Sequence, residues 1–264
     1  MSDIATTTGY TAILDGRVLR ITLTNPKRKN AIDYDTMAAL GDTIRAASTN
    51  PAVRVIVVTG EGGDFCTGAD LSAADEYTAR GITNEMILDA ANGMVKAIVE
   101  APIPVIARVK GSAAGIGVAI ALAADLTYLS EDAYLLLAFI NIGLMPDGGA
   151  AGLVAAAAGR PLAAEMALLG ERLPARDALA HGLVAGVYSE AGLDAKVEAA
   201  VDKLAHGPRR ALELTKQALG TAALSSFDAV LAAEKSGQCE LLDSADFAEG
   251  AAAMLQKRKA VFAE

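Results

Sequence analysis

The segment VRVIVVTGEGGDFCTGADL, residues 53–71, decides the fold because it joins a strand directly to a glycine-rich loop. Val53–Thr59 consists mostly of β-branched residues, a composition typical of a strand that is buried on both faces. Gly60–Asp64 contains three glycines, which mark the end of the strand and the start of a loop. The segment 105–117 repeats this order, with a strand at 105–109 followed by GSAAGIG. Two strands that each lead into a glycine-rich loop therefore form the centre of the predicted structure.

Strands and helices alternate on both sides of these segments, and from about residue 163 the pattern is almost entirely helical. Apolar residues at helical spacing, such as Met37, Leu40 and Ile44, predict the first helix. The other expected strands cover residues 10–14, 17–23, 126–129 and 134–137. The other expected helices cover residues 85–99, 118–124, 149–158, 194–205, 208–222, 227–242 and 247–262. This order predicts an α/β core followed by a helical C-terminal region.

The composition is unusually apolar, with 53% hydrophobic residues and a mean hydropathy of +0.34 over 264 residues. The two longest uncharged runs, Gly111–Ala124 and Ala133–Pro146, are shorter than the roughly 20 residues that a membrane-spanning helix needs. Met1–Tyr10 is polar and lacks the basic and apolar regions of a leader peptide. We therefore expect a soluble, cytoplasmic protein with no membrane partner, in which part of the apolar surplus forms a subunit interface.

The charge balance argues against general nucleic-acid binding, because 32 acidic residues outnumber 23 basic ones. An anionic ligand would have to be met by a local basic cluster, and the chain contains two, Lys27–Lys29 and Lys257–Lys259. Cys66 and Cys239 provide neither a disulfide framework nor metal-ligand spacing. With only two histidines in addition, we expect no metal site.

The two glycine-rich loops, 65–71 and 111–117, could bring backbone N–H groups close to a ligand. Two such groups that face one another would form an oxyanion hole, which stabilises negative charge on a substrate oxygen. The same glycines also fit ordinary tight turns between a strand and a helix. Spacing alone leaves both interpretations open.

Asp147 is the only Asp, Glu, His, Lys or Arg between Asp132 and Arg160. A carboxylate in such apolar surroundings is expected to be partly desolvated, which raises its pKa and suits it to general-base chemistry. It also precedes an Ala-rich helix, where Asp is a good N-terminal cap. Both roles are open for Asp147, whereas Asp125, at a helix-to-strand junction, is expected to be structural.

Taken together, these segments resemble the enoyl-CoA hydratase/isomerase (crotonase) superfamily, with the pieces in the order that the family has. The Gly-Ala-Asp-Leu and Pro-Asp-Gly-Gly segments are the most specific of them. The full set of matching segments is Asn25-Pro26, Lys29-Asn30-Ala31, Phe65–Leu71, Pro104–Ala107, Gly115–Gly117, Ile142–Gly149, Ala180–Val184, Glu249-Gly250 and Lys257–Lys259.

The resemblance implies a spiral of ββα turns, which we place at residues 1–200, and a helical trimerisation region at residues 201–264. It implies a homotrimer or a dimer of trimers. It also implies an acyl-CoA thioester as substrate, with no separate cofactor because coenzyme A is part of the substrate.

The resemblance also assigns site residues. The backbone N–H groups of Ala69 and Ile116 correspond to the family's oxyanion hole, although Ile116 stands where a glycine is common. The family's contacts to coenzyme A correspond to Lys27, Lys29, Ala31, Asp70 and Leu71, with Met254 and Lys257 reaching it from a neighbouring subunit.

The chain departs from the family's hydratases at the two glutamates that bind and activate water, because those positions are Ala119 and Phe139. Asp147 stands where several Δ3,Δ2-enoyl-CoA isomerases and phenylacetate-pathway relatives carry a single acid/base. We therefore expect an isomerase that moves a double bond through an enolate, with Asp147 as the catalytic acid/base. Two alternatives remain at this point. One is a binding protein without turnover, and the other is a hydratase that takes its carboxylate from one of Asp75, Glu76 and Glu85.

Overall fold

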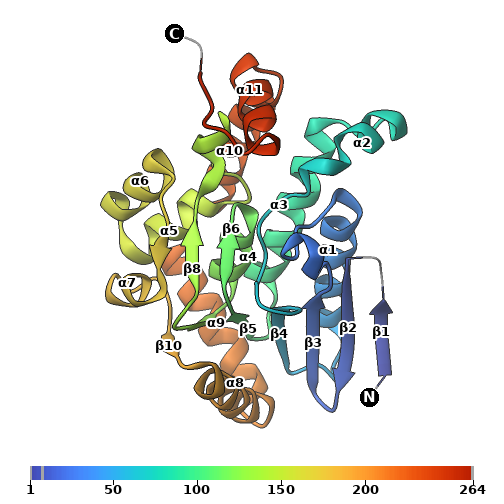
Figure 1. Ribbon diagram of the computed structural model, residues 1–264. Helices are drawn as coiled ribbons and strands as arrows, with labels where there is room; N and C mark the ends of the chain where they lie inside the picture. The colour runs from blue at the N-terminus through green and yellow to red at the C-terminus, as the bar shows by residue number, and fades with distance from the viewer. Residues whose placement is uncertain (1, 7–8, 263–264) are drawn as a thin grey trace.

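The structure, a computed structural model, describes residues 2–6 and 9–262 (Figure 1). Its main sheet has seven strands in the order β1-β2-β3-β4-β5-β7-β10. The first three are antiparallel neighbours, and from β3 onward every pair is parallel. These strands are β1 Ser2–Thr6, β2 Tyr10–Asp15, β3 Val18–Leu23, β4 Val55–Gly60, β5 Val105–Val109, β7 Leu126–Ser130 and β10 Gly186–Tyr188. A second sheet joins β6 Ser112–Ala114, β8 Tyr134–Leu136 and β9 Leu173–Pro174.

The helices fill most intervals between the strands and most of the C-terminal part of the described chain. The first six are α1 Tyr34–Thr49, α2 Ala74–Arg80, α3 Asn84–Glu100, α4 Ile116–Ala123, α5 Ala150–Ala158 and α6 Arg160–Leu169. The remaining five are α7 Ala175–Ala180, α8 Glu190–Ala205, α9 Arg209–Ala223, α10 Phe227–Leu242 and α11 Ala245–Leu255. Three 3-10 helices are η1 Pro26–Arg28, η2 Leu71–Ala73 and η3 Ala138–Ile142.

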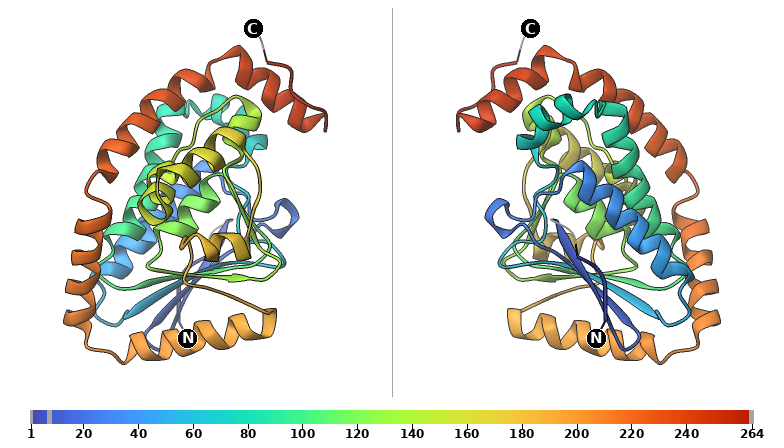
Figure 2. Two further views of the ribbon diagram at one scale, coloured as in Figure 1. Left: turned by 90° about the vertical axis from the view of Figure 1, so that its left-hand side faces the viewer. Right: turned by 90° about the vertical axis from the view of Figure 1, so that its right-hand side faces the viewer.

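Both faces of the main sheet are covered, as the β-branched run in β4 predicts. Ile56 and Val58 face the large core shared with α1, α3 and α4, whereas Val55 and Val57 face a smaller core shared with α8. Figure 2 shows α8 beneath the sheet, whereas α1, α3 and α4 lie above it. All four side chains are at most 4% exposed, which accounts for the unbroken hydrophobic run in this strand.

The C-terminal helices α9 and α10 follow one another up one side of the molecule, and α11 continues across its top (Figure 2). The predicted final helix is too long, because α11 ends at Leu255 rather than at residue 262. Lys257 has a left-handed backbone with φ of 54°, which stops the helix one residue after its Gln256 cap. Among the described residues, no helix is both long and apolar enough to cross a membrane.

Candidate active site

The two glycine-rich loops lie directly against one another. Cys66 and Ala113 pair as a parallel bridge, and the Ala114 N–H donates to the Cys66 carbonyl at 2.8 Å. A Cβ atom on Gly115 would lie only 3.5 Å from the Gly68 Cα atom, and Gly115 has a positive φ of 54° that glycine tolerates. Main-chain atoms of the two loops are therefore in contact, with no side chain between them.

Ala69 and Ile116 each present a backbone N–H group at this contact. Ile116 is the first residue of α4, so its N–H has no acceptor within the helix. At Ala69, the two backbone hydrogen bonds of the bridge to Ile32 are made by the residues on either side of it. The Ile32 N–H donates to the Gly68 carbonyl, and the Ile32 carbonyl accepts from the Asp70 N–H. In the described backbone, neither the Ala69 nor the Ile116 N–H donates a backbone hydrogen bond. Two unused donors on adjoining loops are what an oxyanion hole requires.

Asp147 lies in the turn before α5, but it does not cap that helix. The N-cap residue of α5 is Gly149, so the alternative prediction that Asp147 caps this helix is wrong. The Asp147 Oδ2 atom accepts a hydrogen bond of 3.1 Å from Gln238 Nε2 on α10. The Oδ1 atom is shielded from solvent and has no hydrogen-bond partner among the described residues. Burial raises the pKa of Asp147 to about 6, and the bond from Gln238 opposes that rise.

Gly148, which follows Asp147 in the chain, lies against apolar side chains of the second glycine-rich loop and of α4. A Cβ atom on Gly148 would lie 3.1 Å from Ile116 Cγ1 and 3.3 Å from the Ala119 Cβ atom. A Cβ atom on Gly115 would lie 3.9 Å from the Phe139 Cζ atom. Ala119 is fully buried and Phe139 is 8% exposed. Ala119 and Phe139, which the family resemblance aligns with the two hydratase glutamates, therefore lie beside the second glycine-rich loop and carry no polar group.

Two buried polar side chains of α10 complete the surroundings of Asp147, and neither is among the residues predicted from the sequence. Glu234 accepts from the Gly149 N–H at 2.6 Å and from the Ala151 N–H at 3.2 Å, so it caps α5 from another helix. Gln238 accepts from the Met145 N–H at 3.1 Å while its amide nitrogen donates to Asp147. The pKa of Glu234 rises to about 8, chiefly through burial and further through the nearby Asp147 charge.

A sequence signal for these two side chains exists. The buried residues of α10 are Phe227, Leu231, Glu234 and Gln238, which recur at intervals of four, three and four along one helix face. An acid and an amide that continue an apolar stripe must have buried partners. The pattern thus predicts a polar contact in the core but not its partner, which lies 91 residues away for the Gln238–Asp147 pair.

Replacing Glu234 with Gln is expected to flatten the dependence of stability on pH. The folded protein holds the Glu234 proton up to a pKa of about 8, whereas the unfolded chain releases it near the ordinary glutamate pKa of 4.5. The folded state therefore binds more protons across this interval, and the free energy of unfolding falls as pH rises through it. One such group changes the free energy of unfolding by at most about 1.4 kcal/mol for each pH unit.

Urea unfolding at about pH 6.5 and pH 8 measures this slope. In this range the corresponding contribution of Asp147 is largely complete, because the range lies above the Asp147 pKa of about 6. Glu240→Gln, on the exposed side of the same helix, is the matched control and should keep the wild-type slope. An unchanged slope in Glu234→Gln would show that this carboxyl group does not carry the excess proton.

The first glycine-rich loop also contacts the basic loop around η1. The Thr67 N–H donates to the Lys29 carbonyl at 3.1 Å, and Arg28 forms a 3.1 Å ion pair with Asp70. Lys29 Nζ lies 3.5 Å from an oxygen of Asp64, and its side chain remains 59% exposed. The structure therefore brings together the predicted coenzyme A contacts of the two loops.

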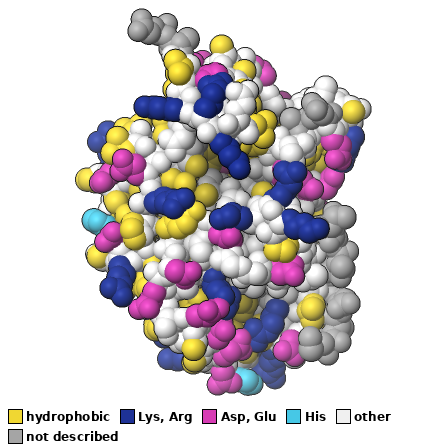
Figure 3. Space-filling model, viewed as in Figure 1, with side chains coloured by type: hydrophobic (Ala, Val, Ile, Leu, Met, Phe, Trp, Pro, Cys, Tyr) yellow, Lys and Arg dark blue, Asp and Glu magenta, His cyan; other side chains and the backbone are white. Residues whose placement is uncertain are grey.

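The other predicted contacts in these loops differ in exposure. Lys27 is exposed, whereas Ala31 and Leu71 are half-buried. On the face shown in Figure 3, Lys and Arg side chains are scattered among carboxylates rather than gathered into one patch.

Met254 and Lys257 lie apart from these loops in sequence, at the end of α11, and both are exposed. The helix itself packs closely on η3 of its own chain, where a Cβ atom on Gly250 would lie 2.5 Å from the Ile142 Cα atom. The contact of Met254 and Lys257 with coenzyme A in a neighbouring subunit stays a prediction.

The acids considered as alternatives to Asp147 lie on the surface. Glu76 pairs with Arg80 at 2.9 Å, and Glu85 pairs with Lys235 at 3.0 Å. Both carboxylates are more than half exposed, so neither enters the buried region around Asp147. The side chain of Asp75 lies outside the described part of the structure.

Two further residues have structural roles. Asp125 accepts from the Val105 N–H at 2.8 Å and forms a 2.7 Å ion pair with Lys216, which agrees with the structural role expected for it. Cys66 is fully buried, and burial raises the pKa of its thiol to about 12. A thiol with that pKa remains protonated and acts as a packing group. Among the described residues, no group of His, Cys, Asp and Glu is arranged to hold a metal ion.

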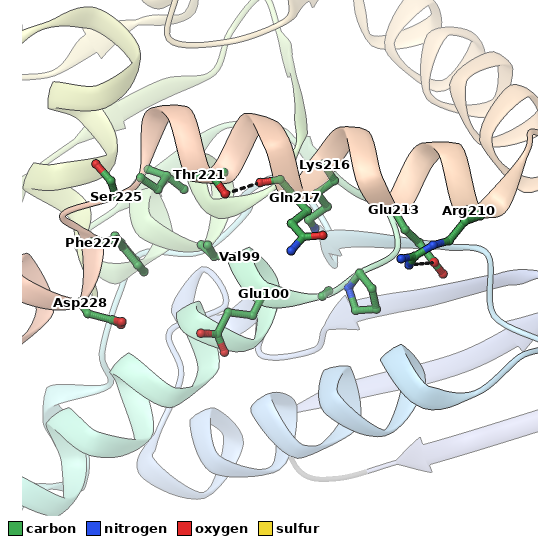
Figure 4. A pocket seen from close by; sticks show the side chains of 14 residues that line it. Val99, Glu100, Arg210, Glu213, Lys216, Gln217, Thr221, Ser225, Phe227 and Asp228 are labelled. Atoms are coloured by element: carbon green, nitrogen blue, oxygen red, sulfur yellow. Dashed lines mark hydrogen bonds and ion pairs between the residues drawn. The ribbon is translucent and has the colours of Figure 1, made fainter.

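A groove of about 380 Å³ lies elsewhere, between α9, the start of α10 and the end of α3 (Figure 4). Its polar lining mixes opposite charges, including Glu100, Arg210, Glu213 and Lys216. None of the predicted site residues lines it. Its position and charge do not match the site built from the two glycine-rich loops.

Comparisons with known proteins agree with the architecture. The family model described as enoyl-CoA hydratase/isomerase matches residues 14–264. A crystal structure of an enoyl-CoA hydratase from Mycobacterium avium subsp. paratuberculosis K-10 covers 98% of this chain and is itself covered completely. The two chains are 41% identical, with a TM-score of 0.91. This likeness confirms the predicted fold class.

Two curated relatives carry different activities in their names. A probable enoyl-CoA hydratase of Rhodobacter capsulatus is 36% identical over 90% of this chain and 91% of its own length. The 1,2-epoxyphenylacetyl-CoA isomerase of Escherichia coli K12 is 32% identical over 93% of this chain and 94% of its own length. On the family match and these similarities, the chain belongs to the enoyl-CoA hydratase/isomerase family.

Proposed function

We propose that this protein is an acyl-CoA isomerase that moves a double bond from C3 to C2 of the acyl chain. The observation that carries the proposal is the pairing of Asp147 with two adjoining glycine-rich loops. Among the described residues, the Asp147 Oδ1 atom has no hydrogen-bond partner, and the N–H groups of Ala69 and Ile116 donate no backbone hydrogen bond. A desolvated carboxylate beside an oxyanion hole is the arrangement needed to remove a proton next to a thioester carbonyl.

In this mechanism the thioester oxygen accepts hydrogen bonds from the Ala69 and Ile116 N–H groups. These bonds strengthen as the oxygen gains charge, so they favour the enolate over the ground state. Asp147 removes a proton from C2 of a 3-enoyl-CoA and returns it to C4. The electron pair of the C2–H bond first forms a C1–C2 double bond, which places the negative charge on the thioester oxygen. When Asp147 returns the proton, the π pair of the C3–C4 double bond forms the new C4–H bond. The C1–C2 pair then becomes the C2–C3 double bond, and the thioester carbonyl re-forms. One carboxyl group thus completes the cycle unchanged.

The same surroundings argue against hydration. Addition of water needs a base that activates the water and an acid that protonates C2, held together at the site. Ala119 and Phe139 are apolar and occupy the places of the two hydratase glutamates. A hydratase with a different carboxylate is the second candidate, because relatives of this chain are named as hydratases.

The remaining parts of the proposal concern binding and assembly. Lys27, Lys29, Ala31, Asp70 and Leu71 bind the nucleotide and pantetheine parts of coenzyme A. Met254 and Lys257 of a neighbouring subunit add to this site in a homotrimer or a dimer of trimers. The reaction uses no cofactor beyond the coenzyme A of the substrate, and it takes place in the cytoplasm.

A panel of 2-enoyl-CoA and 3-enoyl-CoA substrates of several chain lengths tests the activity, with the absorbance of the 2-enoyl thioester as readout. We expect the absorbance to rise with at least one 3-enoyl-CoA and to stay constant with the matching 2-enoyl-CoA. Decay of the 2-enoyl-CoA signal at a comparable rate would assign the protein to the hydratases. Binding of coenzyme A thioesters without change in either signal would identify a binding protein and contradict the proposal.

A further inference from the structure

Gln238 contacts Asp147 in a way that fixes the orientation of its own amide. Its Oε1 atom accepts from the Met145 N–H at 3.1 Å, so the oxygen end of the amide must face the backbone. The Nε2 end then necessarily faces Asp147 and donates to Oδ2 at 3.1 Å. Gln238 is 1% exposed, so water does not compete for either contact.

The two oxygens of Asp147 are therefore unlike one another. Oδ2 accepts a bond that is anchored through Gln238 to the backbone of the same turn, whereas Oδ1 has no partner among the described residues. A carboxyl group can rotate and exchange its oxygens unless one of them is held. A single anchored donor thus leaves Oδ1 as the oxygen that can gain and lose a proton.

We propose that Gln238 is a positioning residue that holds Oδ2 of Asp147 and thereby presents Oδ1 to the substrate. This inference rests on the proposed function, since it assigns Asp147 the proton transfer. Gln238 acts through Asp147 and has no contact of its own with the acyl chain. Because the donated bond favours the charged carboxylate, it also keeps Asp147 ionised at neutral pH.

The effect of the Gln238 bond on the Asp147 pKa is measurable because few titratable side chains surround Asp147 among the described residues. Glu234, one turn before Gln238 on α10, is the titratable group whose interaction with Asp147 is resolved, and it retains its own proton up to about pH 8. The contacts to the Asp147–Gly148 turn from α4, Ile116 and Ala119, are apolar. The acidic limb of the pH–rate profile is thus expected to report Asp147, and a second change above pH 7 to report Glu234.

Gln238→Met removes the donor while keeping the length of the side chain. We expect kcat for a 3-enoyl-CoA to fall by about 10- to 100-fold, because the carboxyl group is no longer aligned. KM should remain within about twofold of wild type, since no contact with the substrate is lost. The midpoint of the acidic limb of kcat should move up by about one pH unit, because a bond to the carboxylate has been removed.

Gln217→Met, on the exposed face of α9, is the matched control and should change neither kcat nor the pH profile. If Gln238→Met does not fold, Gln238→Asn serves in its place, because the shorter amide cannot reach both Met145 and Asp147. A folded variant with the wild-type pH midpoint and kcat would overturn the inference. Asp147→Asn distinguishes failure of the Gln238 inference from failure of the proposed function. An active Asp147→Asn protein would refute the proposed function itself.

Discussion

Replacing Asp147 with Asn is expected to lower the rate of 3-enoyl-CoA isomerisation by about 10²- to 10⁴-fold, the usual worth of a positioned acid/base. Asparagine keeps the shape of the side chain and can still accept the bond from Gln238 through its oxygen. It cannot take up the C2 proton, however, so the enolate would form without a base. The initial rate of 2-enoyl thioester formation at saturating substrate measures the effect.

Asp132→Asn is the matched control for this substitution, because Asp132 is exposed in the turn between β7 and β8. It should retain the wild-type rate. The Asp147→Asn protein should still bind a coenzyme A thioester, since the oxyanion loops and the basic loop are unchanged. A wild-type rate in Asp147→Asn would mean that another group transfers the proton.

Replacing Gly117 with Ala is expected to damage both stability and catalysis, because it separates the two glycine-rich loops. The new Cβ atom would lie 2.3 Å from the carbonyl oxygen of Cys66, a backbone atom that cannot move aside by rotation. Cys66 accepts from the Ala114 N–H at 2.8 Å, so a shift breaks the contact that aligns the loops. We expect a loss of about 1–3 kcal/mol in the free energy of unfolding.

The same shift moves the Ile116 N–H, which adjoins Gly117 in the chain. Loss of one oxyanion donor typically lowers kcat by about 10²- to 10³-fold. Urea unfolding and steady-state kinetics report the two effects separately. Gly220→Ala is the control, since nothing lies within 4 Å of its new Cβ atom in α9, and it should stabilise the protein by up to about 1 kcal/mol. Full activity in Gly117→Ala would contradict the assignment of the hole.

Local pattern accounts for the elements that the sequence predicts well. β4 is marked by an unbroken β-branched run and α10 by a stripe at helical spacing, and both elements lie close to the expected positions. Strands β9 and β10 have only two and three residues, which is too short for an alternation of apolar and polar residues to predict a strand. They form because β8 and β7 supply partners that the local sequence does not contain.

The short helix α2 is not among the helices predicted from the sequence, because it too depends on contacts with distant residues. Its sequence is polar and reads as a loop, yet Arg80 pairs with Asp35 and the Tyr77 hydroxyl accepts from the Tyr34 N–H at 2.8 Å. These contacts come from the start of α1, about 43 residues away for the Tyr77 pair. Tertiary contacts thus override the weak local preference.

The candidate site is predictable in part, because glycine-rich loops after strands and an isolated acid are local features. Proximity of the loops to Asp147 follows from the family's architecture rather than from spacing. The buried partners Glu234 and Gln238 could not be assigned, since their contacts span 85 and 91 residues. A helix stripe reveals that they are buried, and only the fold reveals what they hold.

The most direct test of the account is the mass of the product that the wild-type protein forms from a 3-enoyl-CoA. Isomerisation moves a proton within the substrate and leaves its mass unchanged, whereas hydration adds one water molecule. For an isomerase we expect a product of unchanged mass with the double bond at C2, formed by wild type and not by Asp147→Asn. A product heavier by one water, formed at a comparable rate, would contradict it.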